Sequence, residues 1–131
     1  MKKKNSRCEF ASERSEALLR NFRESIARQS RISIRRAFSD AVEAPAPRFW
    51  VSEARTMRVI TMMLKGMDIL DSMRPEKRRM YEEIYRRVIK QKEEHPDMPL
   101  GDIVFDVVNS PAPRSYMSVR YAAKIIKRNP C

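Results

Sequence analysis

The sequence predicts an all-α protein built as a tandem repeat of two three-helix units that share a core. Apolar residues recur at helical spacing along most of the 131 residues, and no alternating apolar pattern extends beyond a few residues. The chain has two glycines, one at the end of a predicted helix and one at the start of another. A repeat indicates the number of units: Pro45–Ser52 returns 66 residues later as Pro111–Ser118, with the apolar register unchanged on both sides.

The first unit is expected at residues 12–66, after a basic and disordered tail at 1–11. Apolar side chains at helical spacing indicate a first helix at about 12–29 and a second, amphipathic helix at 33–43. A single unit of this size buries too little surface to be secure, so the two units are expected to support each other.

Two prolines end the second helix, because Pro45 and Pro47 cannot continue a helix interior and push the residue before each of them toward extended geometry. Ser52 then suits the N-cap of a third helix, since its hydroxyl can accept a hydrogen bond from an unpaired backbone N–H. This helix is expected to run to about Lys65, with Gly66 as its C-terminal cap.

A bridge at 67–74 leads into the second unit at 75–128, and a short tail at 129–131 follows. Pro75 is a favoured first residue of a helix, which is expected at 75–94.

The second unit then repeats the remaining elements of the first. A helix at about 100–109 carries the same apolar register as its counterpart, Pro111 and Pro113 repeat the break, and Ser118 caps a last helix that ends near Lys127. The shared register predicts buried side chains at Phe38, Val42, Ile60, Val104, Val108 and Ile126.

The chain is strongly basic, with a formal net charge of +11 and a calculated pI of about 10.2. Residues 1–62 carry 14 Lys and Arg against seven Asp and Glu, and residues 63–131 carry 14 against 10. Such a balance favours a polyanionic partner such as nucleic acid or an anionic membrane. The alternative is an ordinary solvated surface without an acidic partner.

Other features exclude several function classes. No apolar stretch is long enough for a membrane span, and the basic start of the chain lacks the apolar run of a secretory signal. Cys8 and Cys131 form no spacing motif, so neither a disulfide framework nor a zinc site is expected, and a reducing cytoplasm fits best. With His95 as the single histidine and no glycine-rich phosphate loop, no enzyme, cofactor or metal is expected.

The order of helices in each unit resembles that of helix-turn-helix DNA-binding domains, although the turn here is longer and rich in proline. The resemblance implies that the starts of the third helices contact DNA, where Arg can bond guanine edges and Arg or Lys can hold phosphates. The candidate contact residues are Arg55, Arg58, Arg120, Tyr121 and Lys124. The alternative is that these residues are simply the solvated face of a short helix.

The repeated turn supplies a second set of candidates, with a structural role. They are Pro45, Pro47, Arg48, Trp50, Ser52, Pro111, Pro113, Arg114, Tyr116 and Ser118. Arg48 and Arg114 either reach a phosphate beside a helix N-terminus, or act as struts that bond bare carbonyls or pair with the matched acids Asp40 and Asp106. Trp50 and Tyr116 either stack on nucleobases or plug the local core, and the plug is favoured. The motif as a whole loosely resembles small basic bacterial proteins carried on mobile elements and phages.

These observations lead to one expected function and two alternatives. We expect a small DNA-binding protein that uses two helix-turn-helix-like units and mainly phosphate contacts, in regulation, replication or packaging of a bacterial or mobile genome. The first alternative is a protein-interaction module or a component of a virion or complex, which uses the repeated turns and a methionine and aromatic surface. The second is an RNA- or ribosome-associated protein.

Overall fold

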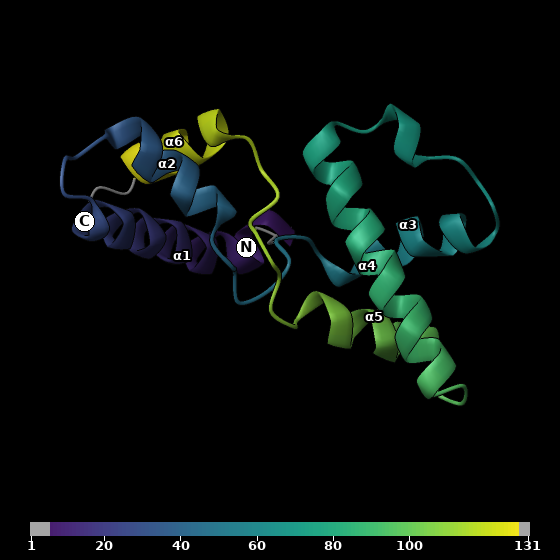
Figure 1. Cartoon of the computed structure of the whole chain (residues 1–131). Helices are drawn as coiled ribbons and strands as arrows, with labels where there is room; N and C mark the ends of the chain where they lie inside the picture. Colours follow the sequence, from purple (N-terminus) through teal and green to yellow (C-terminus); the bar gives the residue numbers. More distant parts are fainter. Residues whose placement is uncertain (1–5, 129–131) are drawn as a thin grey trace, which may run out of the picture. The chain divides into compact units, whose positions relative to one another are not determined.

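The computed structural model describes the backbone of residues 6–128 and the side chains of residues 10–128 (Figure 1). Within these residues all regular secondary structure is helical, apart from one isolated β-bridge. The elements are α1 (Ser6–Arg28), α2 (Ile34–Glu43), α3 (Glu53–Leu64), a 3₁₀ turn η1 (Leu70–Ser72), α4 (Pro75–Glu94), α5 (Leu100–Val108) and α6 (Val119–Arg128).

The helix boundaries follow the 66-residue offset of the repeat. Helices α2 and α5 begin at Ile34 and Leu100, helices α3 and α6 begin at Glu53 and Val119, and the ends of α1 and α4 are matched in the same way. The order of helices is therefore repeated along the chain.

The N-terminal helix is longer than the sequence predicts, because it begins at Ser6. The disordered tail expected at 1–11 is thus wrong for residues 6–11. The physical reason is Phe10, which is buried with its ring 6.0 Å from the ring of Trp50. Residues 1–5 and the tail expected at 129–131 lie outside the described part.

The chain forms two compact units, and their composition differs from the expected tandem arrangement of 12–66 and 75–128. The split unit comprises residues 6–50 and 111–128 and contains α1, α2 and α6; the central unit comprises residues 51–110 and contains α3, η1, α4 and α5. Helix α6 packs on α1 and α2, while α3 packs on α4 and α5. The third helix of each repeat therefore packs with the first two helices of the other repeat.

The core of the split unit lies where α1, α2 and α6 meet. Its buried residues are Leu18, Ala41, Val42, Ala122, Ile125 and Ile126. Phe38 was expected to be buried but is half-buried at the edge of this cluster, where it stacks on Phe22 with ring centroids 4.9 Å apart. Burial of Val42 and Ile126 is as predicted.

The core of the central unit is drawn from all three of its α-helices. The buried residues are Thr56, Val59 and Ile60 on α3, Met80, Tyr81, Ile84 and Val88 on α4, and Ile103, Val104, Val107 and Val108 on α5. The predicted burial of Ile60, Val104 and Val108 is confirmed.

The two proline-rich segments pair with each other inside the split unit. Ala46 and Ala112, which hold the same place in the two copies, form an antiparallel bridge with N···O distances of 2.9 and 2.8 Å. The Ser115 N–H also donates to the carbonyl of Val42 at 2.9 Å. This bond satisfies a carbonyl in the last turn of α2, which has no partner within the helix. The two copies differ in backbone conformation at the aromatic position, Trp50 and Tyr116. Tyr116 has φ +52° and is the one non-glycine residue with positive φ among the described residues.

The helix ends follow the predicted capping. Ser52 Oγ accepts from the N–H of Arg55, and Ser118 Oγ accepts from the N–H of Tyr121, both at 3.1 Å. Gly66 has φ +81° and ends α3 with the paired backbone bonds of a Schellman motif. Pro75 is the first residue of α4.

Candidate nucleic-acid interface

Helix α6 has one apolar face and one basic face. Ala122, Ile125 and Ile126 are buried against α1 and α2. The opposite side carries four exposed cationic residues at positions i, i+4, i+7 and i+8, which we call the α6 basic face: Arg120, Lys124, Lys127 and Arg128. Since residues three and four apart are neighbours on a helix, the four charges form one continuous stripe.

The charges of the α6 basic face are not neutralised locally. The sequence from Pro111 to the end of the chain contains no Asp or Glu. Within the described residues, none of the four side chains forms an ion pair, and Lys127 Nζ lies 5.8 Å from the centre of the Phe38 ring. This stripe therefore presents a net positive potential to solvent.

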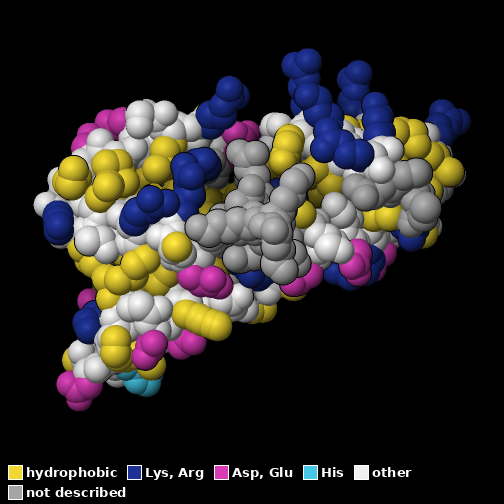
Figure 2. Space-filling model, turned by 180° about the vertical axis from the view of Figure 1, so that it is seen from behind, with side chains coloured by type: hydrophobic (Ala, Val, Ile, Leu, Met, Phe, Trp, Pro, Cys, Tyr) yellow, Lys and Arg dark blue, Asp and Glu magenta, His cyan; other side chains and the backbone are white. Residues whose placement is uncertain are grey.

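The positive charge of the chain is segregated by unit. Segments 6–50 and 111–128 carry 14 Lys and Arg against six Asp and Glu, a net charge of +8. Segment 51–110 carries 11 of each kind and is formally neutral. Figure 2 shows Lys and Arg side chains standing together along the upper margin of the face that includes α6. The excess charge thus belongs to the split unit.

Tyr121 lies in a group of aromatic and guanidinium side chains at the start of α6. The Arg14 guanidinium carbon is 5.5 Å from the centre of the Tyr121 ring and 5.9 Å from that of Phe10. The Arg48 guanidinium carbon is 5.1 Å from the Phe10 ring. Tyr121 remains 46% exposed, so a large part of its surface is open to solvent although Arg14 is stacked near the ring.

The two repeated arginines make different contacts. Arg48 Nε donates to the carbonyl of the next residue, Phe49, at 2.9 Å. Arg114 pairs with Glu43 at 3.3 Å, an acid that sequence reasoning did not offer. The matched acids have other partners: Asp40 accepts from Ser25 Oγ at 2.6 Å, and Asp106 accepts from the side-chain amide of Gln91 at 3.2 Å.

The two aromatic residues of the motif are half-buried. Trp50 Nε1 donates to Ser115 Oγ at 3.4 Å, and the Tyr116 ring stacks on the buried Phe49 ring with centroids 6.0 Å apart. These contacts are those of side chains that close a local core with a polar tip near water.

The candidates on α3 lie in the neutral central unit. Arg55 and Arg58 are exposed, at the start of a helix whose inner face carries Thr56, Val59 and Ile60. Below them, burial raises the pKa of the Tyr81 hydroxyl, and the charges of Arg55 and Arg58 oppose that rise. Arg55 is near enough to lower the pKa of the hydroxyl further as a hydrogen-bond donor, although its geometry is outside that of an ordinary hydrogen bond.

Comparison with known proteins identifies no family for this chain. The chain matches no family model, no curated protein and no solved structure. Over residues 6–128, no helix has both the length and the apolar character needed to cross a membrane. The described His, Cys, Asp and Glu side chains form no group of three or more able to hold a metal ion, and His95 is exposed at the end of α4.

Sequence reasoning identified Arg120, Tyr121 and Lys124 but missed Lys127 and Arg128, which complete the same stripe. The helix-turn-helix resemblance drew attention to the first turns of the third helices only. The 3.6-residue period, continued to the end of α6, is the signal that identifies the other two residues.

Proposed function

We propose that the protein binds duplex nucleic acid, with DNA favoured, through the α6 basic face of the split unit. The observation that carries the proposal is the segregation of charge: the split unit has a net charge of +8 over its described residues, and its third helix has a continuous stripe of four cations without an acid. Non-specific affinity for duplex DNA arises almost entirely from such neutralisation of phosphates.

The dimensions of α6 suit this role. A helix of 10 residues is about 15 Å long, and a helix of about this width fits the major groove of B-DNA. Arg120, Lys124 and Lys127 follow one another along this length, so they can reach successive backbone phosphates. Tyr121 stands beside them with an exposed ring that can contact a sugar or a base edge.

This proposal narrows the expected contact set. Arg120, Tyr121 and Lys124 remain candidates, whereas Arg55 and Arg58 belong to a unit without excess charge and are proposed to contribute little. The biological setting that we propose for this binding is regulation, replication or packaging of a bacterial or mobile genome.

The test is a salt titration of binding to a random-sequence DNA duplex, followed by fluorescence anisotropy. For four phosphate contacts, affinity should fall roughly 150-fold between about 50 and 200 mM salt. The triple variant Arg120→Gln/Lys124→Gln/Lys127→Gln should lower the slope of log affinity against log salt by about 2.7, because it removes three such contacts.

The matched control is Arg55→Gln/Arg58→Gln, which neutralises exposed arginines near the start of the equivalent helix. It should bind the duplex as the parent does. If the triple variant retains the parent's affinity and slope while its circular dichroism is unchanged, the proposal is wrong. Parallel titrations with duplex RNA and with single-stranded RNA separate DNA binding from the RNA-associated alternative.

The protein-partner alternative rests on large apolar side chains that are exposed in both units. The central unit exposes Met62, Leu64, Met67 and Phe105, and the split unit exposes Ile32, Ile34, Val119 and Tyr121. Exposed apolar side chains that gather into a patch are typical of protein interaction sites. If no nucleic acid binds in the titrations above, a protein partner that covers some of these side chains becomes the leading alternative.

A further inference from the structure

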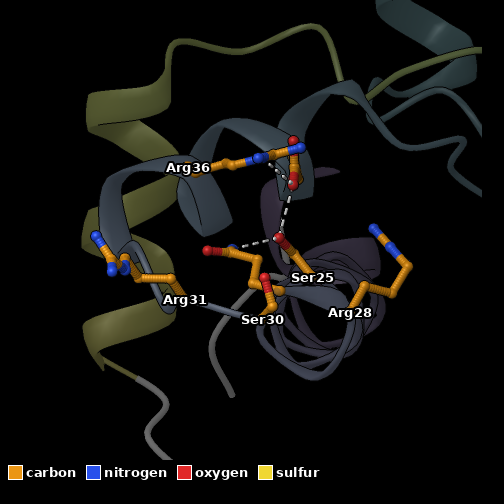
Figure 3. A pocket seen from close by; sticks show the side chains of 7 residues that line it. Ser25, Arg28, Ser30, Arg31 and Arg36 are labelled. Carbon is orange, nitrogen blue, oxygen red and sulfur yellow. Dashed lines mark hydrogen bonds and ion pairs between the residues drawn. The ribbon is translucent and has the colours of Figure 1, made fainter.

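A polar pocket of about 310 Å³ opens where α1 ends and α2 begins. Figure 3 shows it with Arg28 and Arg31 on opposite sides and Arg36 above Ser25. All the lining side chains are polar or charged, and they include three arginines and one acid, Asp40. The pocket belongs to the split unit and is formed by α1, α2 and the loop that joins them.

A network of hydrogen bonds fixes the floor of the pocket. Ser25, which is 1% exposed, donates from Oγ to Asp40 Oδ2 at 2.6 Å. The amide nitrogen of Gln29 donates to Ser25 Oγ at 3.1 Å, and its amide oxygen accepts from the Ser33 N–H at 2.7 Å. This network holds the end of α1 against the start of α2.

The rim carries positive charge that the described residues neutralise only in part. Arg36 pairs weakly with Asp40 at 3.8 Å, whereas Arg28 and Arg31 form no ion pair or hydrogen bond with the residues that the structure describes. The first turn of α2 has no acid, and Arg35 and Arg36 stand there instead. Cations at the positive end of a helix dipole are unfavourable, and neighbouring arginines also repel one another. An anion bound in the pocket would reduce both repulsions.

The equivalent corner of the central unit shows that the fold does not require these arginines. At the 66-residue offset, Arg28, Arg31 and Arg36 correspond to Glu94, Asp97 and Asp102. Helix α5 thereby has an acid in its first turn, as the helix dipole favours.

The floor, by contrast, is repeated. The hydrogen bond from Ser25 to Asp40 has its counterpart in that from Gln91 to Asp106, at the same offset. The hydrogen bond between the first and second helices is thus common to both corners and structural. The reversal of charge at three rim positions is specific to the split unit, and a structural role does not explain it.

We propose that this pocket is a phosphate site, in which Arg28, Arg31 and Arg36 hold a phosphate group through their guanidinium N–H donors. Guanidinium groups pair with phosphate oxygens in bidentate fashion, which gives the strongest hydrogen bonds between side chains and anions. The phosphate comes either from a nucleic-acid backbone or from a free phosphate or phosphomonoester. The proposal does not depend on the α6 basic face.

The test is a ¹H–¹⁵N NMR titration of the full chain with inorganic phosphate, against sodium chloride at equal pH and ionic strength. Phosphate should produce saturable shifts of the backbone amides in 28–36 that chloride does not produce. Arg28→Gln and Arg31→Gln should each weaken phosphate binding about tenfold, the usual effect of losing a charge-assisted contact. The matched control Arg35→Gln removes an exposed arginine of the same helix turn that does not line the pocket, and should change the affinity less than about twofold.

A second variant distinguishes loss of the phosphate site from loss of folding. Arg28→Glu/Arg31→Asp/Arg36→Asp copies the acids of the α4–α5 corner, where one helix ends and the next begins at the matched positions Glu94 and Leu100, so this variant should fold and fail to bind phosphate. The proposal is overturned if the parent shows no saturable shifts, if the triple variant binds phosphate as the parent does, or if Arg35→Gln weakens binding as strongly as Arg28→Gln.

The duplex anisotropy assay distinguishes the sources of the phosphate. If the site takes a backbone phosphate, Arg28→Gln/Arg31→Gln lowers duplex affinity and inorganic phosphate competes with the duplex at constant ionic strength. If it takes a free phosphate group, duplex affinity is unchanged and phenyl phosphate reproduces the shifts. Neutralising the α6 basic face should leave the phosphate titration unchanged, so that failure of the proposed function and failure of the phosphate site are read separately.

Discussion

Ala46 and Ala112 exchange both of their backbone hydrogen bonds, from N–H of one to carbonyl of the other, at 2.9 and 2.8 Å. They hold the same position in the two copies of the proline-rich motif, so the motif pairs with its own repeat. Both are nearly inaccessible, at 3% and 2% exposed. The first copy leads into α3 and the second into α6, the two helices that the repeats exchange.

Enlarging either alanine should therefore weaken the fold. Ala46→Leu and Ala112→Leu are each expected to lower the free energy of unfolding by about 1–3 kcal/mol, the usual cost of overpacking. Urea denaturation followed by circular dichroism measures this. Ala54→Leu, at an exposed position of α3, is the control and should stay within about 0.5 kcal/mol of the parent. Equal effects at the three positions would contradict the pairing of the two motifs.

Two residues of similar size on α3 should contribute very differently to the free energy of unfolding, because one is buried and the other is exposed. Ile60 is fully buried, and Leu64 is 46% exposed at the end of the same helix. Ile60→Ala should cost about 2–5 kcal/mol because it leaves a cavity. Leu64→Ala should cost no more than about 0.5 kcal/mol. Thermal or urea unfolding of both variants would reject the assignment of the inner face if Leu64→Ala were the more destabilising.

The two serine caps should contribute equally, since Ser52 and Ser118 make the same bond to the helix they precede. Ser52→Ala and Ser118→Ala should each lower the free energy of unfolding by about 1 kcal/mol. Ser12→Ala, at an exposed position inside α1, serves as the comparison and should be neutral or slightly stabilising, because alanine has the higher helix propensity. A loss at Ser12 as large as at the caps would contradict the capping roles.

Tyr81 predicts a dependence of stability on pH. Its hydroxyl is buried, so its pKa is raised from the ordinary value of 10.0. A group whose pKa is raised on folding stabilises the folded state below its unfolded pKa, and this contribution is lost as pH rises through the folded pKa. Stability should thus fall above about pH 10, and the fall should be smaller in Tyr81→Phe.

At neutral pH the same Tyr81→Phe variant should differ from the parent by no more than about 1 kcal/mol, because it removes a buried hydroxyl together with the interaction of that hydroxyl with Arg55. Tyr85→Phe, at the half-buried tyrosine of the same helix, is the control for both measurements. Identical alkaline unfolding of parent and Tyr81→Phe would contradict the assigned burial of the hydroxyl.

The sequence predicted the helices well because their signals are local. Prolines, serine caps and Gly66 mark helix ends through backbone chemistry within a few residues, and the boundaries of α4 are as expected. The length of α1 was underestimated, because Phe10 is held by a ring contact with Trp50, 40 residues away in sequence.

Which helices pack together could not be read from the pattern. The apolar positions Val59 and Ile60 on α3 are matched by Ile125 and Ile126 on α6. Either pair could pack on α1 and α2 or on α4 and α5. Periodicity identifies the inner face of a helix but not the helix that this face contacts. Because α6 packs with α1 and α2, its positive charges belong to the same unit as theirs. Dividing the sequence into two halves therefore did not show the basic split unit and the neutral central unit.

The candidate site was only partly predicted, because the sequence pattern does not show which helices pack together. Arg120, Tyr121 and Lys124 were identified from the order of elements, but so were Arg55 and Arg58, since the repeat makes α3 and α6 equivalent. The arginine pocket was missed because Arg28, Arg31 and Arg36 follow no helical stripe and come together only at the corner between α1 and α2.

The most direct test of the account is a methyl NOE measurement that asks which third helix covers α1 and α2. The exchanged arrangement predicts NOEs from the methyl groups of Leu18 and Val42 to those of Ile125 and Ile126, all four in one buried cluster. A tandem arrangement would instead give NOEs from Leu18 and Val42 to Val59 and Ile60, which hold the same positions on α3. The first result supports the basic split unit on which the proposed function rests, and the second would contradict it.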